Sequence, residues 1–412
     1  MELSFLGGAN EVGRSAILLE SDKKFLLDYG VKLFGGPQYP RLLDSLDVLV
    51  TSHAHLDHIG QTPVLFDRFK IPWITTYPTQ PIAGRLLIDS MKIDKEIQFD
   101  STDFDKLMNS FFPLPYEKEF HFSKTSITFH DAGHIPGSAM TELKVNGKKI
   151  VYTGDFNSKE TKLHNGAKTI QNIDTLIIES TYSNREHPDR KDVEKKLKEE
   201  VKKTLDDGGT VLLPCFAVGR TQEMLQVLDS LNLNADIYLE GMGAGVTNII
   251  LDYPSYIRDA KALKKAFKRV NIVTGKEMWK KKKAMHGPGI IVASGGMLEG
   301  GPAIRYVLKL NKQSPKSKVI FTGYGVENTN ARYLLEKGIV KRGEENIRID
   351  LGVEYLDFSA HSGKSDLLEF IKKANPEKVF CVHGDHCPEF AERLKEQGYE
   401  AYAPKLNETH VL

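Results

Sequence analysis

The residues of this chain best suited to chemistry form one short stretch, HAHLDH at positions 53–58. It follows the apolar run 48–50, which predicts a strand. Because side chains alternate along extended backbone, His53 and His55 are expected to face the same point. Asp57 and His58 follow at a turn into a helix and reach a second point nearby. Imidazole and carboxylate groups bind Zn²⁺ and similar metals, so the stretch predicts two adjacent metal sites rather than a histidine-rich surface loop.

Two catalytic metal sites need more ligands than this stretch supplies. His134, Asp155 and His383 each follow an apolar run and lie beside a glycine, and strand ends of this kind present functional side chains. A fourth residue, Asp28, ends the apolar run 24–27. We expect Asp28 to accept a hydrogen bond from a ligand imidazole and so to fix its tautomer.

Two metals about 3.5–4 Å apart can deprotonate a shared water and stabilise an in-line displacement at phosphorus. Hydroxide attack on a phosphodiester, with the 3′ oxygen leaving, would give a 3′-hydroxyl and a 5′-phosphate. The leaving oxygen needs a proton, and histidine is the side chain best suited to donate one near neutral pH. The residues themselves therefore indicate metal-assisted hydrolysis.

The rest of the chain predicts an α/β protein of two domains. Before residue 182, short strands alternate with helical segments at 81–93 and 102–110. Short apolar strands then interleave regularly with helices, which indicates a parallel sheet covered on both faces. The last part returns to complete the first domain. The expected boundaries are 1–182 for the first part of one domain, 183–352 for an inserted domain, and 353–412 for the second part of the first.

Composition favours an intracellular enzyme. The 56 Lys and Arg residues nearly balance the 55 Asp and Glu residues. Binding of nucleic acid would therefore have to depend on a local cluster of positive charge. Three cysteines are too few, and odd in number, for a disulfide framework. The first residues do not read as a signal segment, and no apolar run approaches the ~20 residues of a membrane span. We therefore expect a cytoplasmic protein.

The order of Asp28, the 53–58 stretch, His134 and Asp155 resembles the metallo-β-lactamase superfamily. Three further stretches resemble the β-CASP nucleases: LIIESTY at 176–182, DFSAHSG at 357–363 and VHGD at 382–385. Stretches 6–15 and 214–223 are similar to the branch related to the endonuclease subunit of the cleavage and polyadenylation specificity factor, with its short archaeal relatives. The resemblance covers essentially the whole chain. It implies a metallo-β-lactamase αββα sandwich with an inserted Rossmann-like β-CASP domain.

The resemblance also implies a role for each residue of the site. One of two Zn²⁺ ions would be held by His53, His55 and His134, and the other by Asp57, His58 and His383. Asp155 would bridge the two, and Asp28 would lie behind them. The implied catalytic residues are Asp57, Glu179 and His361, with His361 binding the scissile phosphate or protonating the leaving oxygen. Glu179 would hold that imidazole and favour its charged form.

The implied activity is that of a zinc-dependent ribonuclease. It would hydrolyse phosphodiester bonds of single-stranded RNA, internally or in the 5′–3′ direction, through a hydroxide held by two zinc ions. RNA-directed family members carry histidine at the position of His383, whereas DNA-directed members carry an apolar residue. RNA processing or decay is the expected setting. Related archaeal proteins form homodimers, so a second copy of the chain and a larger RNA-processing complex are the expected partners besides RNA.

Three features suggest where RNA would bind. The run 294–302 is rich in glycine, including Gly295 and Gly296, and opens a helix as phosphate-cradling loops do. The run 261–283 is rich in lysine, including Lys280 and Lys281 beside Trp279, and aromatic residues with cations hold single strands. A solvated helix face explains this lysine run equally well. Ser359 and Ser362, which flank His361, are the remaining predicted contacts.

Two hypotheses from other classes compete with the nuclease. A small-molecule hydrolase of the superfamily, such as a thioesterase or lactonase, would share the histidine stretch but lack a large insert before the last ligand. A non-catalytic RNA-processing subunit would have lost metal ligands, whereas every ligand position is filled here. Metal analysis together with digestion of labelled single-stranded RNA would separate the three.

Overall fold

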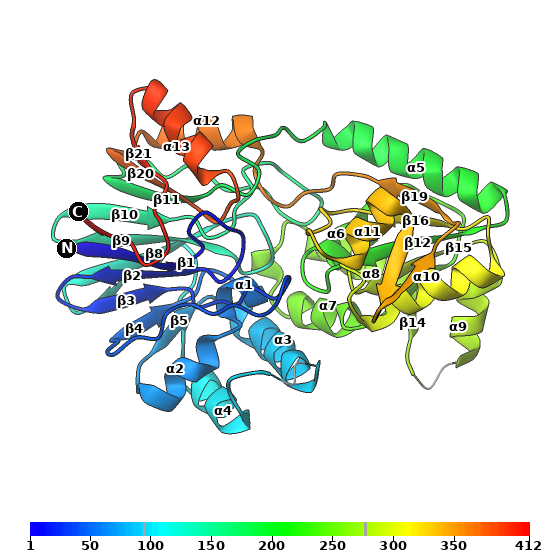
Figure 1. The fold of residues 1–412 in the computed structure, drawn as a ribbon, viewed down its shortest axis with the longest axis horizontal. Coiled ribbons are helices and arrows are strands. Elements are labelled where there is room, and N and C mark those ends of the chain that lie inside the picture. The colour runs from blue at the N-terminus through cyan, green and yellow to red at the C-terminus, as the bar shows by residue number, and fades with distance from the viewer. Residues whose placement is uncertain (94–95, 276–277) are drawn as a thin grey trace. The chain divides into compact units, whose positions relative to one another are not determined.

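The computed structural model describes residues 1–93, 96–275 and 278–412. Residues 276 and 277 of the lysine-rich run lie outside this described part. The chain forms two compact units (Figure 1). Unit 1 consists of Met1–Glu160, His164–Glu186 and Ala360–Leu412, and unit 2 of Thr161–Leu163 and His187–Ser359.

Unit 1 is built on two seven-stranded sheets. The order in the first sheet is β22 (Thr409–Val411), β1 (Glu2–Gly7), β2 (Ala16–Glu20), β3 (Lys24–Leu27), β4 (Val48–Val50), β5 (Trp73–Thr75) and β6 (Phe111–Pro113). The order in the second is β21 (Glu400–Tyr402), β20 (Lys378–Val382), β11 (Thr175–Glu179), β10 (Lys148–Tyr152), β9 (Ala139–Val145), β8 (Thr125–Asp131) and β7 (Phe120–Phe122).

Apolar side chains from the two sheets share one core, in which Phe5, Phe25, Phe129 and Phe380 are fully or almost fully buried. Burying such side chains is the main driving force for stacking two sheets. The helices of the first layer are α1 (Leu56–Ile59), α2 (Thr62–Arg68), α3 (Thr79–Ile93) and α4 (Ser101–Asn109). Helices α12 (Lys364–Ala374) and α13 (Cys387–Glu396) share a second core with strands of the other sheet. The unit is therefore the expected αββα sandwich.

Unit 2 contains a six-stranded sheet in which every described pairing is parallel. Its order is β14 (Val270–Val273), β13 (Ile237–Glu240), β15 (Gly289–Ser294), β12 (Thr210–Cys215), β16 (Lys318–Phe321) and β19 (Gly352–Tyr355). The helices are α5 (Arg190–Asp206), α6 (Arg220–Ser230), α7 (Gly243–Leu251), α8 (Ala260–Lys268), α9 (Met278–Met285), α10 (Gly301–Gln313) and α11 (Asn330–Lys337), with a short 3₁₀ turn at Pro254–Tyr256. A small hairpin joins β17 (Ile339–Arg342) to β18 (Glu345–Arg348). This is the predicted Rossmann-like arrangement.

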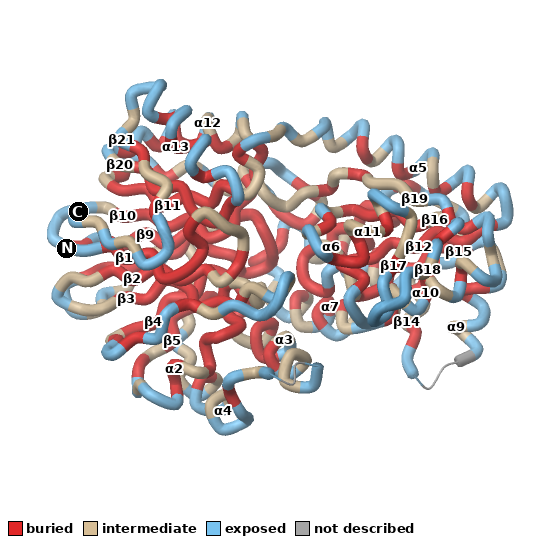
Figure 2. Tube along the Cα trace, in the orientation of Figure 1, coloured by how far each residue is buried: buried red, intermediate tan, exposed pale blue. Residues whose placement is uncertain are grey.

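The central strands are buried along their length, as in β11, β12 and β15, whereas the edge strands β6, β7, β14, β19 and β22 are partly exposed (Figure 2). In the parallel sheet, burial on both faces explains why the sequences of its central strands are short, continuous apolar runs. Among the helices of the described residues, none combines the length and apolar character that a membrane span requires.

Candidate metal centre and acid-base pair

The predicted metal ligands of unit 1 all lie just beyond strand ends. The 53–58 stretch follows β4 and runs into α1, His134 follows β8, Asp155 follows β10, and His383 follows β20 directly. The backbone of His383 has a φ of 50°, which turns the chain sharply at the end of its strand. The fold therefore brings together residues that are separated by more than three hundred positions in the sequence.

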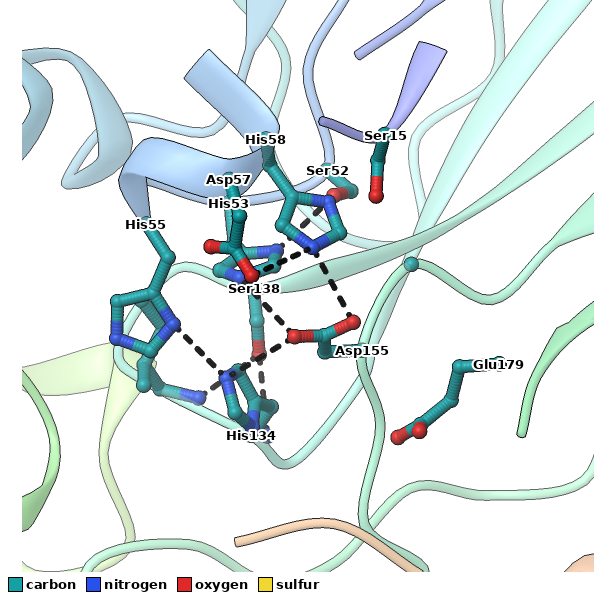
Figure 3. A network of polar contacts seen from close by, with 12 residues as sticks. Ser15, Ser52, His53, His55, Asp57, His58, His134, Ser138, Asp155 and Glu179 are labelled. Carbon is teal, nitrogen blue, oxygen red and sulfur yellow. Dashed lines mark hydrogen bonds and ion pairs between the residues drawn. The ribbon is translucent and has the colours of Figure 1, made fainter. Parts of the chain in front are cut away.

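Three groups of side chains that could hold a metal ion share Asp155 (Figure 3). One joins Asp155 to Glu179 and His361, and the other two are made of the predicted ligands. Of these two, the first consists of His53, His55, His134 and Asp155, and the second of Asp57, His58, Asp155 and His383; in each group the ligand atoms lie within 4.8 Å of one another. Asp155 Oδ2 lies 3.6 Å from His53 Nε2 and 3.7 Å from His134 Nε2. Asp155 Oδ1 lies 3.2 Å from His58 Nε2 and 3.5 Å from His383 Nε2. Each oxygen of this carboxylate thus faces a different group.

The chemistry of these atoms fits divalent cations. His53 Nε2, His58 Nε2 and Asp155 Oδ1 are buried and make no hydrogen bond of normal geometry. An unsatisfied buried polar atom costs about 1–3 kcal/mol, so several at one point need a common partner. Nitrogen and carboxylate donors at this density suit zinc, and the arrangement offers two adjacent positions.

The hydrogen bonds behind the imidazoles point their free nitrogens toward the centre. His134 Nδ1 donates to the carbonyl oxygen of Ala360 at 2.9 Å, so His134 Nε2 carries the lone pair and accepts from His55 Nδ1 at 3.1 Å. His58 Nδ1 lies 2.7 Å from Asp28 Oδ2. A carboxylate can only accept, so His58 also holds its proton on Nδ1. Partners of this kind fix the tautomer and raise the basicity of a ligand imidazole.

Burial and nearby carboxylates set the charges of the site. Burial lowers the pKa of His53 and His134 well below 6.5, so both are neutral and able to bind metal. Burial also lowers the pKa of His58, but Asp155 and Asp28 raise it well above 6.5. Burial raises the pKa of Asp155, whereas His383 and His58 lower it well below 3.8. The metal-free centre therefore holds a charged His58 beside a carboxylate, and a cation would displace that proton on binding.

Glu179 and His361 form a second pair beside the metal ligands. Glu179, the last residue of β11, is fully buried, and its Oε1 lies 2.8 Å from His361 Nδ1. The backbone N–H groups of Phe156 and Thr181 donate to the two Glu179 oxygens at 3.1 and 3.2 Å. Burial lowers the pKa of His361, but the Glu179 carboxylate raises it to about 9. His361 is therefore protonated at neutral pH in the metal-free protein.

Several residues of the site were not predicted from the sequence. Ser15, Ser52 and Tyr152 hydrogen-bond the metal-facing histidines or Asp28. The ring of Tyr182 packs edge-on against His361, with centroids 5.7 Å apart, and the Arg185 guanidinium lies 4.3 Å from the Tyr182 centroid. Tyr182 and Ser15 lie within the stretches that resemble the family. That resemblance was the signal in the sequence that could have identified them.

The predicted RNA contacts are more dispersed. Ser362 belongs to unit 1 and is fully buried, where its hydroxyl accepts from the backbone N–H of Ser158 at 3.0 Å. Ser359 belongs to unit 2 and is half-buried. Gly296 lies against Phe216, because a Cβ at Gly296 would stand 3.3 Å from the Phe216 nitrogen.

The two predicted lysine contacts differ from each other. Lys281 is largely buried, with 14% of its side chain exposed, and its Nζ pairs with Glu240 Oε1 at 2.7 Å. Glu240 also accepts from the Tyr306 hydroxyl. Lys280 lies next to Trp279, whose side chain is 64% exposed. Lys281 therefore pairs with a largely buried carboxylate of unit 2, whereas Lys280 borders an exposed aromatic ring and donates from Nζ to the carbonyl oxygen of Ile272 at 3.3 Å.

Three known domain families match successive parts of the chain. A metallo-beta-lactamase superfamily domain matches residues 17–183, and a Beta-Casp domain matches residues 221–334. A Zn-dependent metallo-hydrolase RNA specificity domain matches residues 346–404. A crystal structure of a protein of unknown function from Enterococcus faecalis shares the fold, with a TM-score of 0.63 and 16% identity over 100% of this chain and 99% of that one.

Three archaeal relatives match nearly the whole of this chain. A probable RNase of Methanocaldococcus jannaschii, MJ4, is 42% identical over 99% of both chains. The RNase aCSPSF2 of Saccharolobus solfataricus is 37% identical over 98% of this chain and 84% of its own. The transcription termination factor FttA of Methanocaldococcus jannaschii is 34% identical over 96% and 69%. With these identities and all three domain matches, the chain belongs to the β-CASP family of metallo-β-lactamase-fold proteins.

Proposed function

We propose that this protein hydrolyses phosphodiester bonds of single-stranded RNA at a centre of two zinc ions. It is a metal-dependent ribonuclease of RNA processing, as its family and its named RNase relatives indicate. The observation that carries the two-metal proposal is Asp155, whose two oxygens face two separate groups of imidazoles. One shared carboxylate between two such groups is the arrangement that a pair of adjacent cations needs.

The roles of the ligands follow from this geometry. His53, His55 and His134 would hold one zinc, Asp57, His58 and His383 the other, and Asp155 both. A zinc pair there supplies a nucleophile at neutral pH and neutralises charge on the phosphoryl oxygens. Because the imidazoles are buried and oriented from behind, they hold their positions without reorganising during the reaction.

Proton delivery to the leaving oxygen is the role proposed for His361. Its Nδ1 is bonded to Glu179, and we assign donation of a proton to the departing 3′ oxygen to its Nε2. Glu179 is held by two backbone N–H groups and so keeps the imidazole in one orientation. A histidine protonated in this way acts as a general acid.

The proposed biological setting follows from the relatives. The named RNase relatives favour RNA processing or decay, and similarity to FttA favours transcription termination as a second setting. Cleavage either within the chain or from the 5′ end agrees with the site. A homodimer, a larger RNA-processing complex and a cytoplasmic location remain predictions from the sequence.

Metal content and product chemistry test the proposed function together. We expect two zinc ions per chain, loss of RNA cleavage on chelation and recovery on adding zinc. The products should carry 3′-hydroxyl and 5′-phosphate ends. Linear substrates with 5′-triphosphate or 5′-monophosphate ends, compared with circular RNA, separate internal cleavage from 5′–3′ digestion. A product ending in a 2′,3′-cyclic phosphate would contradict the proposal, because it requires attack by the RNA itself.

Helix α9 offers a test of the RNA path. RNA affinity falls as salt concentration rises, and the slope of log affinity against log salt reports the number of phosphate contacts. Replacing Lys280 and Lys282 by alanine should make this slope shallower by about 0.7 for each phosphate contact that is lost. Lys281→Ala is the matched control. Since Lys281 pairs with Glu240, its loss should lower thermal stability and leave the slope unchanged. Binding titrations at several salt concentrations decide, and an unaltered slope in the double variant would remove α9 from the RNA path.

A further inference from the structure

We propose that Tyr182 is a positioning residue for the proposed general acid, and that the segment 182–186 holds the His361 imidazole in the orientation from which it delivers a proton. This role rests on the proposed function, because it assumes that His361 protonates the leaving oxygen. The ring contacts and hydrogen bonds that support it all lie within unit 1.

The hydrogen bond to Glu179 does not by itself fix the His361 ring. Glu179 Oε1 lies 2.8 Å from His361 Nδ1, and a ring held by one hydrogen bond can still swing about it. Two aromatic contacts restrict that motion. The centroid of the His361 ring lies 4.6 Å from that of His134 and 5.7 Å from that of Tyr182, and the Tyr182 ring meets it edge-on at 79°. Edge-to-face contact is a favoured geometry for aromatic rings, so Tyr182 stabilises one orientation of the imidazole.

The backbone of Tyr182 is fixed against the segment that carries His361. Tyr182 forms a parallel β-bridge with Gly363, which follows His361 by two residues. The Tyr182 carbonyl accepts from the Arg185 N–H at 3.3 Å, and the Arg185 carbonyl accepts from the Lys364 N–H at 2.9 Å. The Arg185 guanidinium also lies 4.3 Å from the centroid of the Tyr182 ring, a favourable contact between a cation and an aromatic ring. The ring that contacts His361 is thus held both by its own main chain and by a neighbouring cation.

Glu186 extends the same pairing to helix α12, which begins at Lys364, three residues after His361. Gly363 is the N-cap residue of α12 and has no side chain that could cap the helix. Glu186 Oε2 instead accepts from the Ser365 N–H at 3.2 Å, and Glu186 Oε1 accepts from the Ser365 hydroxyl at 2.6 Å. A carboxylate at this place satisfies an N–H group of the first helical turn and interacts favourably with the helix dipole. The segment 182–186 therefore also holds the chain that follows His361.

The main chain next to His361 has further anchors that do not involve Tyr182. The Ser362 N–H donates to the Phe156 carbonyl at 3.0 Å, and the Ser362 hydroxyl accepts from the Ser158 N–H at 3.0 Å. Removing the Tyr182 ring should therefore leave this backbone in place and release only the imidazole. The expected defect is one of proton delivery and not of folding.

Two substrates with different leaving groups test this role. We expect Tyr182→Leu to cleave RNA about tenfold more slowly, which is the scale of one lost aromatic contact. The same variant should hydrolyse bis(p-nitrophenyl) phosphate at the wild-type rate, because p-nitrophenolate leaves without a proton. Tyr182→Phe keeps the ring and should cleave RNA normally, and both variants should hold as much zinc as wild type. Wild-type cleavage of RNA by Tyr182→Leu where His361→Ala is impaired, or an equal loss on both substrates, would overturn the proposal.

Tyr402→Leu is the matched control. The Tyr402 ring packs edge-on against another histidine of unit 1, with its centroid 5.1 Å from that of His410 and an interplanar angle of 62°. Tyr402 lies on β21, the edge strand of the second sheet. Its replacement should leave the cleavage of both substrates unchanged. A loss on RNA alone, as large as that of Tyr182→Leu, would also overturn the proposal.

The NMR signals of the His361 imidazole give a second readout that does not depend on activity. In wild type and Tyr182→Phe we expect one narrow set of ring signals. In Tyr182→Leu we expect two sets or broadened signals, because the ring then samples more than one orientation, and a single narrow set would overturn the proposal. Wild-type cleavage of RNA by His361→Ala would contradict the proposed acid instead, and these spectra would still decide whether Tyr182 orients His361.

Discussion

Replacing Asp155 by asparagine is expected to lower RNA cleavage by at least about a thousandfold, or about 4 kcal/mol of transition-state stabilisation. Asparagine keeps the shape of the side chain but substitutes an amide N–H₂ for one oxygen, and that group cannot bind a cation. The two Asp155 oxygens face different groups of imidazoles. The Asp155→Asn substitution should therefore remove a ligand atom from one zinc position. The two positions would then no longer share a carboxylate.

Zinc content and single-turnover cleavage of a labelled RNA measure this effect. We expect Asp155→Asn to hold fewer than two zinc ions per chain and to remain inactive when zinc is added. Asp67→Asn is a suitable control, because Asp67 is 67% exposed and contacts Lys106 on the surface of the same unit. A variant that keeps both ions and cleaves within tenfold of wild type would show that Asp155 does not bridge the metals.

The sequence was sufficient to select candidate ligands, which the fold brings together, because their chemistry is rare and their spacing is tied to strand ends. Three imidazoles and a carboxylate within six residues stand out from any background. The hydroxyl groups that contact these ligands or Asp28 do not stand out in the sequence. Ser15, Ser52 and Tyr152 are common residue types, and their importance arises from donor and acceptor directions that only the folded backbone sets.

Long-range pairing also limited what could be predicted. The lysine at 281 reads as part of a cationic run, but Glu240, its partner, lies on a strand forty-one residues earlier. The segment Thr161–Leu163 joins unit 2 although it lies within the first predicted domain. Glu223 accepts from the backbone N–H groups of Lys162 and Leu163 at 3.1 and 2.8 Å, which attaches the segment to α6. Neither the Lys281–Glu240 pair nor the attachment of Thr161–Leu163 to Glu223 is marked by a pattern in the neighbouring sequence.

His361→Ala is expected to keep both zinc ions and to cleave RNA about 10²–10⁴-fold more slowly, the usual contribution of a general acid. His361 lies beside the metal ligands, with its ring centroid 4.6 Å from that of His134, but Glu179 already occupies its Nδ1. Its contribution should therefore be to the proton that the leaving oxygen needs. His121→Ala, which alters an exposed histidine of the same unit, should cleave normally.

The leaving group separates this role from a general loss of structure. A 3′ alkoxide leaves poorly without a proton, whereas an aryl oxide such as p-nitrophenolate leaves readily without one. If His361 is the acid, the defect of His361→Ala should be large on RNA and should nearly vanish on an aryl phosphodiester measured with the same enzyme. An equal loss on both substrates would mean that His361 binds the phosphate or supports the metal centre, since neither of those roles depends on how well the leaving oxygen departs.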